Sequence, residues 1–513
     1  MTKFLSILSL ISVLSTSAFS SEVNEYIREF HENPSEVMNS VPEKTPVVGD
    51  ESMLDNMVSP FGHKPLGLGD IVEIKDEGRG KICRIQDGIV VCGNDDQGRA
   101  GIQHNDNFRN VVDASSSYIT KLSEVEPRNL MSRELSVQPW SDDYWAIANG
   151  VLAHRYAHES GEKEHLWDQA LQKFKATPTS ELIEQNLIYK LSPAEKYDLL
   201  VGDKNFTLTK AMFEEGRKYF DRSGEVEPWM GICHGWAAAA YMLPRPKKVV
   251  WVKSADGQYD IPFYPSDIKS LGSLIYAKND YPSTFIGGRC NVKDPAKDEN
   301  GRVIDQKCFD TNPGTWHFAV INQVGVNDRS LVMDATFDYE VWNQPIISYN
   351  IRYFNPESMS YVYGLSQATV TKYNFKRDKF KKYRDPRAQY FVGVEMEVKY
   401  IVETSPSHNQ MDGPRYDGIK SVTYLYDLEL DAQRNVIGGE WYNNNHPDFL
   451  WNPTKGGSIT TSTDKFLASQ GIFQWNVSKV VDPKLSSYVS YESRRGSPLA
   501  LIVKELFRAS STK

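Results

Sequence analysis

The sequence predicts an α+β fold in which a cysteine-bearing helix packs against an antiparallel sheet. Cys233 is followed by an alanine run at residues 237–240, which favours a helix, and Pro228 and nearby glycines favour a helix start just before it. Residues 391–403 and 422–430 alternate apolar and polar side chains, which is typical of half-buried strands. A turn-forming stretch leads from the second of these strands into a third, so antiparallel neighbours are expected.

Composition indicates a globular protein rather than a nucleic-acid-binding one. The chain has 513 residues, of which 40% are hydrophobic and 12% aromatic, enough for buried cores. Its length predicts two or three domains. The net charge of −9 argues against nucleic acid as a partner, because such binding needs a basic patch.

Residues 1–20 have the features of an export signal. A lysine at position 3 precedes an apolar run at residues 4–14, and small residues lead to a cleavage site after Ser20. The apolar run is too short for an ordinary membrane span, and no later stretch approaches that length. We therefore expect an exported protein without a transmembrane anchor, destined for the periplasm, the cell surface or the medium.

Residues 21–135 are predicted to form an N-terminal extension. Residues 21–60 are polar and predict little order, whereas residues 65–112 predict a small β-rich module. Two interpretations stay open for this extension: a propeptide that keeps the enzyme latent, or an accessory domain.

Five cysteines predict two disulfides and one free thiol. An Asp-Gly turn at residues 87–88 would form a hairpin that pairs Cys83 with Cys92 in a non-hydrogen-bonded position, where the two Cα atoms are close enough for a disulfide. Cys290 and Cys308 would then close the loop between them. Cys233 would remain free; the alternative is that all five cysteines are reduced.

Residues 136–370 are predicted to form the core that carries the site. Helices are expected at residues 144–158, 166–175, 193–201 and 210–220. A strand is expected at residues 248–252, followed by a strand and then a helix within residues 261–277. The same core contains Cys233 at its helix N-terminus, where unpaired N–H groups and the helix dipole favour the reactive thiolate.

A histidine and an aspartate follow on predicted strands. His317 lies in the apolar stretch 315–321 and Asp334 in the stretch 331–336, with a turn-like segment between them. Adjacent antiparallel strands would bring the two side chains together. A cysteine at a helix N-terminus with these partners is the arrangement of papain-type thiol enzymes.

Other residues compete for these roles. His234 is rejected as the base because neighbouring positions on a helix do not face each other. His446 is interpreted as structural, and Asp338 as lying past the strand end.

Residues 371–513 are predicted to form a β-rich region that completes the core or packs on it. The basic stretch 372–387 is interpreted as a solvated inter-domain segment, with a protease-sensitive linker and an anionic cell-wall contact as alternatives. Residues 436–442 continue the strand pattern, and residues 498–508 predict a short amphipathic helix.

Three segments resemble the secreted transglutaminase elicitor family, which is described from oomycete cell-wall transglutaminases and also occurs in bacteria. They are residues 231–236 (GICHGW), residues 316–319 (WHFA) with 333–335 (MDA), and residues 341–345 (VWNQP). The third segment is similar to the start of the peptide that plants recognise in the oomycete members, whereas residues 346–354 depart from that peptide. Residues 446–451 (HPDFLW) are also similar to the family, and the resemblance covers residues 136–480.

The resemblance implies a protein-glutamine γ-glutamyltransferase with a papain-like transglutaminase core. Cys233 would attack a glutamine carboxamide, His317 would move the proton, and Asp334 would orient the imidazole. The thioester would pass to a lysine or polyamine amine. The Cys233 backbone N–H is one oxyanion donor, and a Trp indole or a Gln amide would serve as the second. Four tryptophans near the triad in sequence are candidates for a hydrophobic substrate tunnel: Trp229, Trp236, Trp316 and Trp342.

Two other functions remain open. If water reaches the thioester, the same triad makes a cysteine protease or a glutamine deamidase. A non-catalytic exported protein that binds a cell wall or host surface is the second alternative.

No metal or other cofactor is required by this chemistry. The acidic loop 294–301 fails the EF-hand pattern, because aligning Gly301 on position six places Ala296 at position one and Lys307 at position twelve. Calcium remains an alternative because some transglutaminases depend on it.

Overall fold

A computed structural model describes most of the chain after residue 105. Its described residues are 28–40, 106–156, 166–288, 290, 292, 294–305, 308, 311–335, 340–358, 360–459, 461–472 and 474–512, together with the backbone of four N-terminal strands. The predicted export signal and Asp338 lie outside the described residues.

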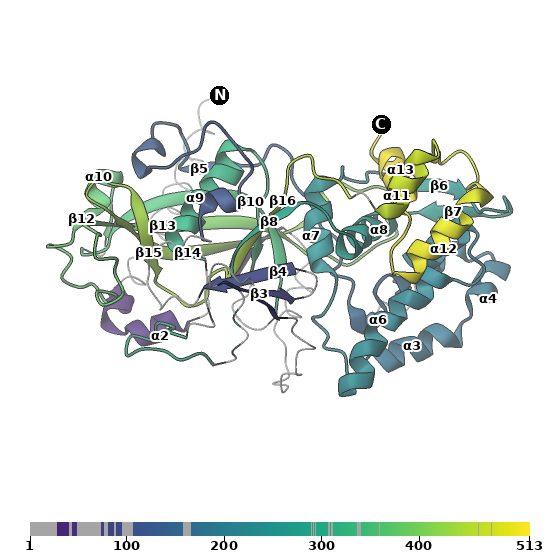
Figure 1. The fold of residues 1–513 in the computed structure, drawn as a ribbon, viewed down its shortest axis with the longest axis horizontal. Coiled ribbons are helices and arrows are strands. Elements are labelled where there is room, and N and C mark those ends of the chain that lie inside the picture. The colour runs from purple at the N-terminus through teal and green to yellow at the C-terminus, as the bar shows by residue number, and fades with distance from the viewer. Residues whose placement is uncertain are drawn as a thin grey trace, which may run out of the picture.

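One large antiparallel sheet, eleven-stranded in the described part of the chain, forms one side of the molecule (Figure 1). Its main path runs β1-β14-β13-β10-β9-β16-β8, and β5, β11, β12 and β15 pair with strands of this path. The strands are β1 (Lys44–Val48), β5 (Ser132–Glu134), β8 (Ser283–Gly287), β9 (Val332–Asp334), β10 (Asn343–Asn355), β11 (Ser360–Tyr361), β12 (Thr369–Thr371), β13 (Tyr390–Val402), β14 (Gly418–Leu430), β15 (Val436–Trp441) and β16 (Phe449–Pro453).

The period-two pattern of the long central strands fits their packing. β13 pairs with β14 over its whole length and with β10 on its other side. Val394 and Met396 of the predicted apolar face are buried in the sheet core. Glu395, on the opposite face, accepts a hydrogen bond from Arg352 at 2.6 Å. The region after residue 371 therefore contributes strands to the same sheet as β10.

Most helices gather at the other side of the molecule, around the β6–β7 hairpin, whereas α2, α9 and α10 lie at the sheet side (Figure 1). The described helices are α2 (Pro34–Met38), α3 (Trp167–Ala176), α4 (Thr179–Glu184), α5 (Pro193–Val201), α6 (Thr207–Ser223), α7 (Cys233–Met242), α8 (Pro265–Lys278), α9 (Pro313–Val320), α10 (Leu365–Ala368), α11 (Ser462–Ser469), α12 (Ser486–Arg494) and α13 (Ala500–Ser511). The hairpin joins β6 (Val250–Lys253) to β7 (Asp260–Phe263).

Local chemistry explains where several of these helices begin and how closely they pack. Ser192 and Glu195 form a capping box at the start of α5, and Pro193 occupies its first position. The predicted bounds of this helix, 193–201, are confirmed. α7 packs closely on α8, because a Cβ at Gly235 would lie 2.2 Å from the Ser273 carbonyl oxygen.

Two secondary-structure predictions in the core are wrong. Residues 144–156 do not form a helix; two short 3₁₀ turns, Ile147–Asn149 and Val151–Ala153, stand there, with Gly150 in the left-handed region between them. The stretch around His317 is helix α9 followed by a π-helical turn, not a strand. Asn312 caps α9 by accepting a hydrogen bond from the Gly314 N–H, which fixes the helix start.

Most basic side chains of the stretch 372–387 are exposed, as a solvated segment predicts, but a few buried residues attach the stretch to the sheet. Phe375 and Phe380 are buried. Arg384 is buried and forms ion pairs with three carboxylates, those of Asp378, Asp427 and Glu429. The cell-wall contact suggested for this stretch stays a prediction.

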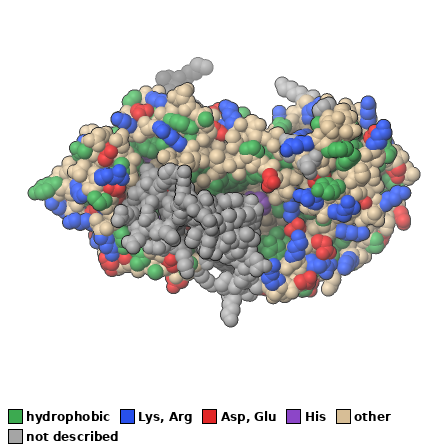
Figure 2. Space-filling model, viewed as in Figure 1, with side chains coloured by type: hydrophobic (Ala, Val, Ile, Leu, Met, Phe, Trp, Pro, Cys, Tyr) green, Lys and Arg blue, Asp and Glu red, His purple; other side chains and the backbone are tan. Residues whose placement is uncertain are grey.

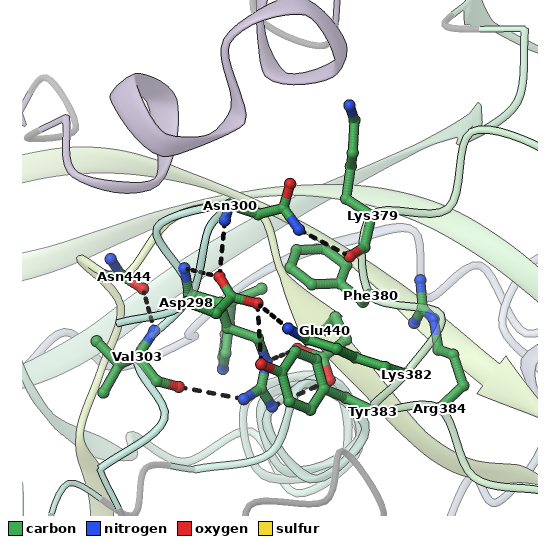
Figure 3. A network of polar contacts seen from close by, with 12 residues as sticks. Asp298, Asn300, Val303, Lys379, Phe380, Lys382, Tyr383, Arg384, Glu440 and Asn444 are labelled. Atoms are coloured by element: carbon green, nitrogen blue, oxygen red, sulfur yellow. Dashed lines mark hydrogen bonds and ion pairs between the residues drawn. The ribbon is translucent and has the colours of Figure 1, made fainter. Parts of the chain in front are cut away.

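The acidic loop that had suggested calcium joins this stretch in a polar network (Figure 3). Asp298 accepts hydrogen bonds from the Asn300 and Arg302 backbone N–H groups and from the Tyr383 hydroxyl. Arg302 donates to Glu440 at 2.7 Å. Protein donors thus occupy the Asp298 carboxylate, and the loop is attached to the sheet.

The cysteines follow the predicted pairing where they are described. Cys290 and Cys308 form a disulfide that closes this loop. In the N-terminal module, β3 (Lys81–Gln86) and β4 (Ile89–Asn94) pair antiparallel and place Cys83 opposite Cys92, which is the predicted register. The side chains of these two strands lie outside the described residues. β2 (Glu73–Lys75) is the third strand of that sheet. Among the described helices, none is long and apolar enough to cross a bilayer.

Candidate thiol active site

Cys233 is the first residue of α7, which lies where the helical side meets the sheet (Figure 1). The thiol is buried and free of any disulfide. It donates to the Val341 carbonyl oxygen, with a sulfur–oxygen distance of 3.6 Å. The N–H groups of the first helical turn have no carbonyl partner within the helix. Cys233 therefore has the predicted position at a helix N-terminus.

Asn343, the first residue of β10, faces the thiol. Its side-chain amide nitrogen Nδ2 donates to the Cys233 sulfur at 3.5 Å. Its amide oxygen accepts a hydrogen bond from the indole N–H of Trp451 on β16 at 2.8 Å. The indole hydrogen bond determines which end of the amide faces the sulfur, because only the NH₂ end can then point toward it.

Asp334 lies beside Asn343 on the neighbouring strand. The two residues are direct partners in the antiparallel β9–β10 pair, so their side chains project from the same face of the sheet. The Asp334 carboxylate accepts a hydrogen bond from the Trp342 backbone N–H at 3.1 Å. Its charge raises the pKa of the Cys233 thiol. The structure thus brings two of the three predicted catalytic residues, Cys233 and Asp334, to one place.

A second carboxyl group, Glu403, lies near this place. The Gln344 amide donates to both of its oxygens at 2.9 Å. Burial raises the pKa of Glu403 to about 7, against the lowering effect of the Gln344 hydrogen bond. Its negative charge also raises the pKa of Cys233.

The thiol pKa moves in the opposite direction from the one predicted. Burial raises it to about 11, and the backbone and side-chain donors of Asn343 only partly offset this rise. Desolvation disfavours the thiolate more than these two donors favour it. The thiol is therefore protonated at neutral pH, and its proton must be removed during any reaction.

His317 does not join this group. It lies on the buried helix α9, where its Nδ1 is hydrogen-bonded to the Tyr426 hydroxyl at 2.8 Å. Its Nε2 has no hydrogen-bond partner among the described residues. Burial lowers the pKa of the imidazole to about 3, so the ring is neutral. The predicted pairing of His317 with Asp334 across two strands is wrong, because β9 pairs with β10 and β16 instead.

The four predicted tunnel tryptophans lie in different surroundings. Trp342 follows Val341 and precedes Asn343, so it borders the thiol site, and its ring packs on Tyr144 with centroids 5.3 Å apart. Trp229 is partly buried and donates to Glu227. Trp236 and Trp316 are fully buried in two separate cores. Trp236 and Trp316 thus pack within cores, and the tunnel role of the four tryptophans stays a prediction.

Sequence reasoning missed Asn343 and Trp451 as individual site residues. Both lie in segments that already resembled the family, residues 341–345 and 446–451. The signal was an asparagine at the start of a strand in one segment and a tryptophan in the other, but only the sheet register joins them. His446, interpreted as structural, stacks on Trp441 with ring centroids 4.5 Å apart.

The face of the molecule seen in Figure 2 is mixed in charge where its residues are described. On the visible side, Lys and Arg side chains are mixed with Asp and Glu (Figure 2). Within the described residues, no group of three or more His, Cys, Asp or Glu side chains has a metal-binding arrangement.

Fold and site together define a protein of mixed helices and sheet, in which a free cysteine at a helix N-terminus faces an antiparallel sheet. The family model described as transglutaminase elicitor matches residues 114–483, so this chain belongs to the transglutaminase elicitor family. The resemblance seen in the sequence is thereby confirmed.

Comparison with individual proteins adds less. No curated protein matches the chain. Among solved structures, the GP42 transglutaminase from Phytophthora sojae is similar at 20% sequence identity, over 74% of this chain and 94% of that chain, with a TM-score of 0.46.

Proposed function

We propose that this protein is an exported protein-glutamine γ-glutamyltransferase whose nucleophile is Cys233. The observation that carries the proposal is the position of the free thiol at the start of α7, with the Asn343 amide on its sulfur and Asp334 on the adjacent strand. Membership of the family supports acyl transfer as the reaction class.

The reaction begins with attack of the Cys233 sulfur on the carbon of a glutamine carboxamide. A carbon–sulfur bond forms, the carbonyl electron pair moves to oxygen, and the thiol proton moves to a base. Asp334 is the proposed base, because it is the carboxylate that the sheet register places beside Asn343. Collapse of the intermediate breaks the carbon–nitrogen bond, and ammonia leaves with the transferred proton. A lysine or polyamine amine then attacks the thioester, which gives an amide bond and restores the thiol.

The role predicted for His317 requires a different arrangement. Its imidazole would have to leave Tyr426 and its buried position on α9 to reach the sulfur. We therefore assign the proton transfer to Asp334 and keep His317 as the competing base.

Export and activation belong to the same proposal. The Cys290–Cys308 disulfide suits an oxidising compartment outside the cytoplasm. Because Cys233 is buried, we propose that the chain rests in a closed state and that residues 21–135 include the part whose release opens it.

Incorporation of a labelled primary amine into casein tests the function. Full-length protein, protein treated with a protease in limited amounts, and the Cys233→Ala variant are compared, each with calcium and with a chelator. Incorporation that depends on Cys233 supports the proposal. Cys233-dependent ammonia release without incorporation would mean a deamidase, and Cys233-dependent peptide fragments would mean a protease. Inactivity in every arm would favour the surface-binding alternative.

A further inference from the structure

We infer that Asn343 supplies the second oxyanion donor of the acyl-transfer reaction and that Trp451 fixes its amide in the donating orientation. The inference rests on the proposed function, since it concerns the same thiol. It assigns the second donor to an asparagine amide, which the sequence had left between an indole and a glutamine.

The contacts of Asn343 support its role as an oxyanion donor. Its Nδ2 lies 3.5 Å from the Cys233 sulfur, and its side chain is buried. In the tetrahedral intermediate the charged oxygen is two bonds from the sulfur, so a donor beside the sulfur can reach an oxygen that lies on its side of the new bond. The Cys233 backbone N–H, at the helix N-terminus, would donate from the other side. Asn343 donates without giving up its proton.

The Trp451 indole fixes the orientation of the Asn343 amide. An asparagine amide can turn through half a rotation and exchange its oxygen for its nitrogen. The indole nitrogen of Trp451 can only donate a hydrogen bond. It lies 2.8 Å from the side-chain oxygen of Asn343, which accepts this bond. A turned amide would place two donors against each other at Trp451 and an oxygen against the developing oxyanion. Trp451 is therefore a positioning residue.

Burial makes this arrangement effective. Asn343 is 3% exposed and Trp451 is 4% exposed, so little water competes for their hydrogen bonds. Oriented donors in such surroundings stabilise developing charge more than they do in water, because no reorganisation is needed during the reaction.

Three variants test the inference: Asn343→Ala, Trp451→Phe and the control Trp167→Phe. Trp167 is also buried, and its indole donates to a backbone carbonyl, that of Phe213, in the helical part. Each variant is measured for amine incorporation, for the rate of Cys233 alkylation by iodoacetamide against pH, and for its melting temperature.

We expect Asn343→Ala to lower kcat by about 100-fold, the usual loss for one oxyanion donor. Alkylation forms no oxyanion, so its limiting rate at high pH should change by less than about threefold. The thiol pKa should rise, because the Asn343 side-chain donor that the variant loses lowers it, while the backbone donor stays in place. Trp451→Phe should lower kcat by roughly tenfold with little change in KM, whereas Trp167→Phe should keep the wild-type kcat.

Other outcomes would overturn the inference. Wild-type kcat in folded Asn343→Ala would do so, and so would equal losses in kcat and in limiting alkylation rate, which indicate general disorder of the site. If Asn343→Ala does not fold, Trp451→Phe decides by the same criteria. If the wild-type protein shows no acyl transfer, the proposed function fails, and an unchanged thiol pKa in Asn343→Ala then separately refutes the Asn343 contact.

Discussion

The side-chain amide of Asn343 lies 3.5 Å from the sulfur of Cys233, and the amide reaches it from the first position of β10. Cys233 comes from the helical side of the molecule and Asn343 from the sheet, 110 residues further along the chain. The thiol therefore lies at the contact between the two parts, and its chemistry depends on their packing.

Replacing Asp334 with asparagine should change alkylation and turnover in opposite directions. The negative charge of Asp334 raises the pKa of Cys233, so its removal should shift the alkylation midpoint to lower pH. Loss of the proposed base should lower turnover by about 100-fold or more. Iodoacetamide kinetics and amine incorporation on the same preparation check both signs. Wild-type turnover in Asp334→Asn would remove Asp334 from the mechanism.

His317→Ala should destabilise the protein without altering the thiol. The change leaves a cavity and removes one partner of the Tyr426 hydroxyl, at a cost of roughly 2 to 4 kcal/mol. The alkylation rate of Cys233 should stay within about twofold of wild type, because the His317 ring, on α9, is hydrogen-bonded to Tyr426 and not to the sulfur. The hydrogen bonds of the sulfur are with Val341 and Asn343. Urea unfolding and alkylation measure the two effects, with His317→Gln as the control that can retain a hydrogen bond. A large fall in Cys233 reactivity with the fold intact would restore the imidazole as the base.

The carboxyl group of Glu403 should make stability depend on pH. Its pKa is about 7 in the folded protein and near 4.5 when unfolded, so the folded state binds the extra proton between these values. The stabilisation is fully present below pH 4.5 and is lost as the pH rises through 7. The difference in unfolding free energy between Glu403→Gln and wild type should therefore vary with pH in this window, by roughly 1 to 3 kcal/mol. Urea unfolding at several pH values measures it, and a constant difference would contradict the raised pKa.

Removing the Cys290–Cys308 disulfide should lower stability but leave the thiol site unchanged. The bond closes a loop with a sequence separation of 18 residues, and the loss for a loop of this size is about 3 kcal/mol. The ion pair between Arg302 and Glu440 still attaches the loop to the sheet. Thermal unfolding and Cys233 alkylation of the double serine variant test this. An equal loss of Cys233 reactivity would show that the loop also shapes the site.

Local patterns predicted the strands and capped helices well. The alternation in residues 391–403 corresponds to β13, and the helix predicted at residues 193–201 corresponds to α5. The error at His317 has a physical cause, because a short, fully apolar run fits a buried helix as well as a buried strand. The Asn312-Pro313 pair before it is a helix-start signal that outweighs the apolar run.

The site could be predicted only in part. The free thiol and its position at a helix start can be predicted from the cysteine count and the local sequence. The strand that carries Asp334 can be predicted from the apolar stretch around it. The contact of Asn343 with Cys233 depends on the register of β9, β10 and β16, which no local pattern specifies. The thiol pKa depends on burial, and burial arises from packing between distant segments.

Capture of the acyl-enzyme tests the central claim most directly. The protein, opened by limited proteolysis, is incubated with a blocked peptide that contains one glutamine, quenched in acid, and analysed by mass spectrometry of its own fragments. We predict an adduct on Cys233 equal to the peptide mass less ammonia, released by hydroxylamine and absent from Cys233→Ala. Conversion of the glutamine without an adduct on Cys233, or with an adduct on another residue, would contradict Cys233 as the nucleophile.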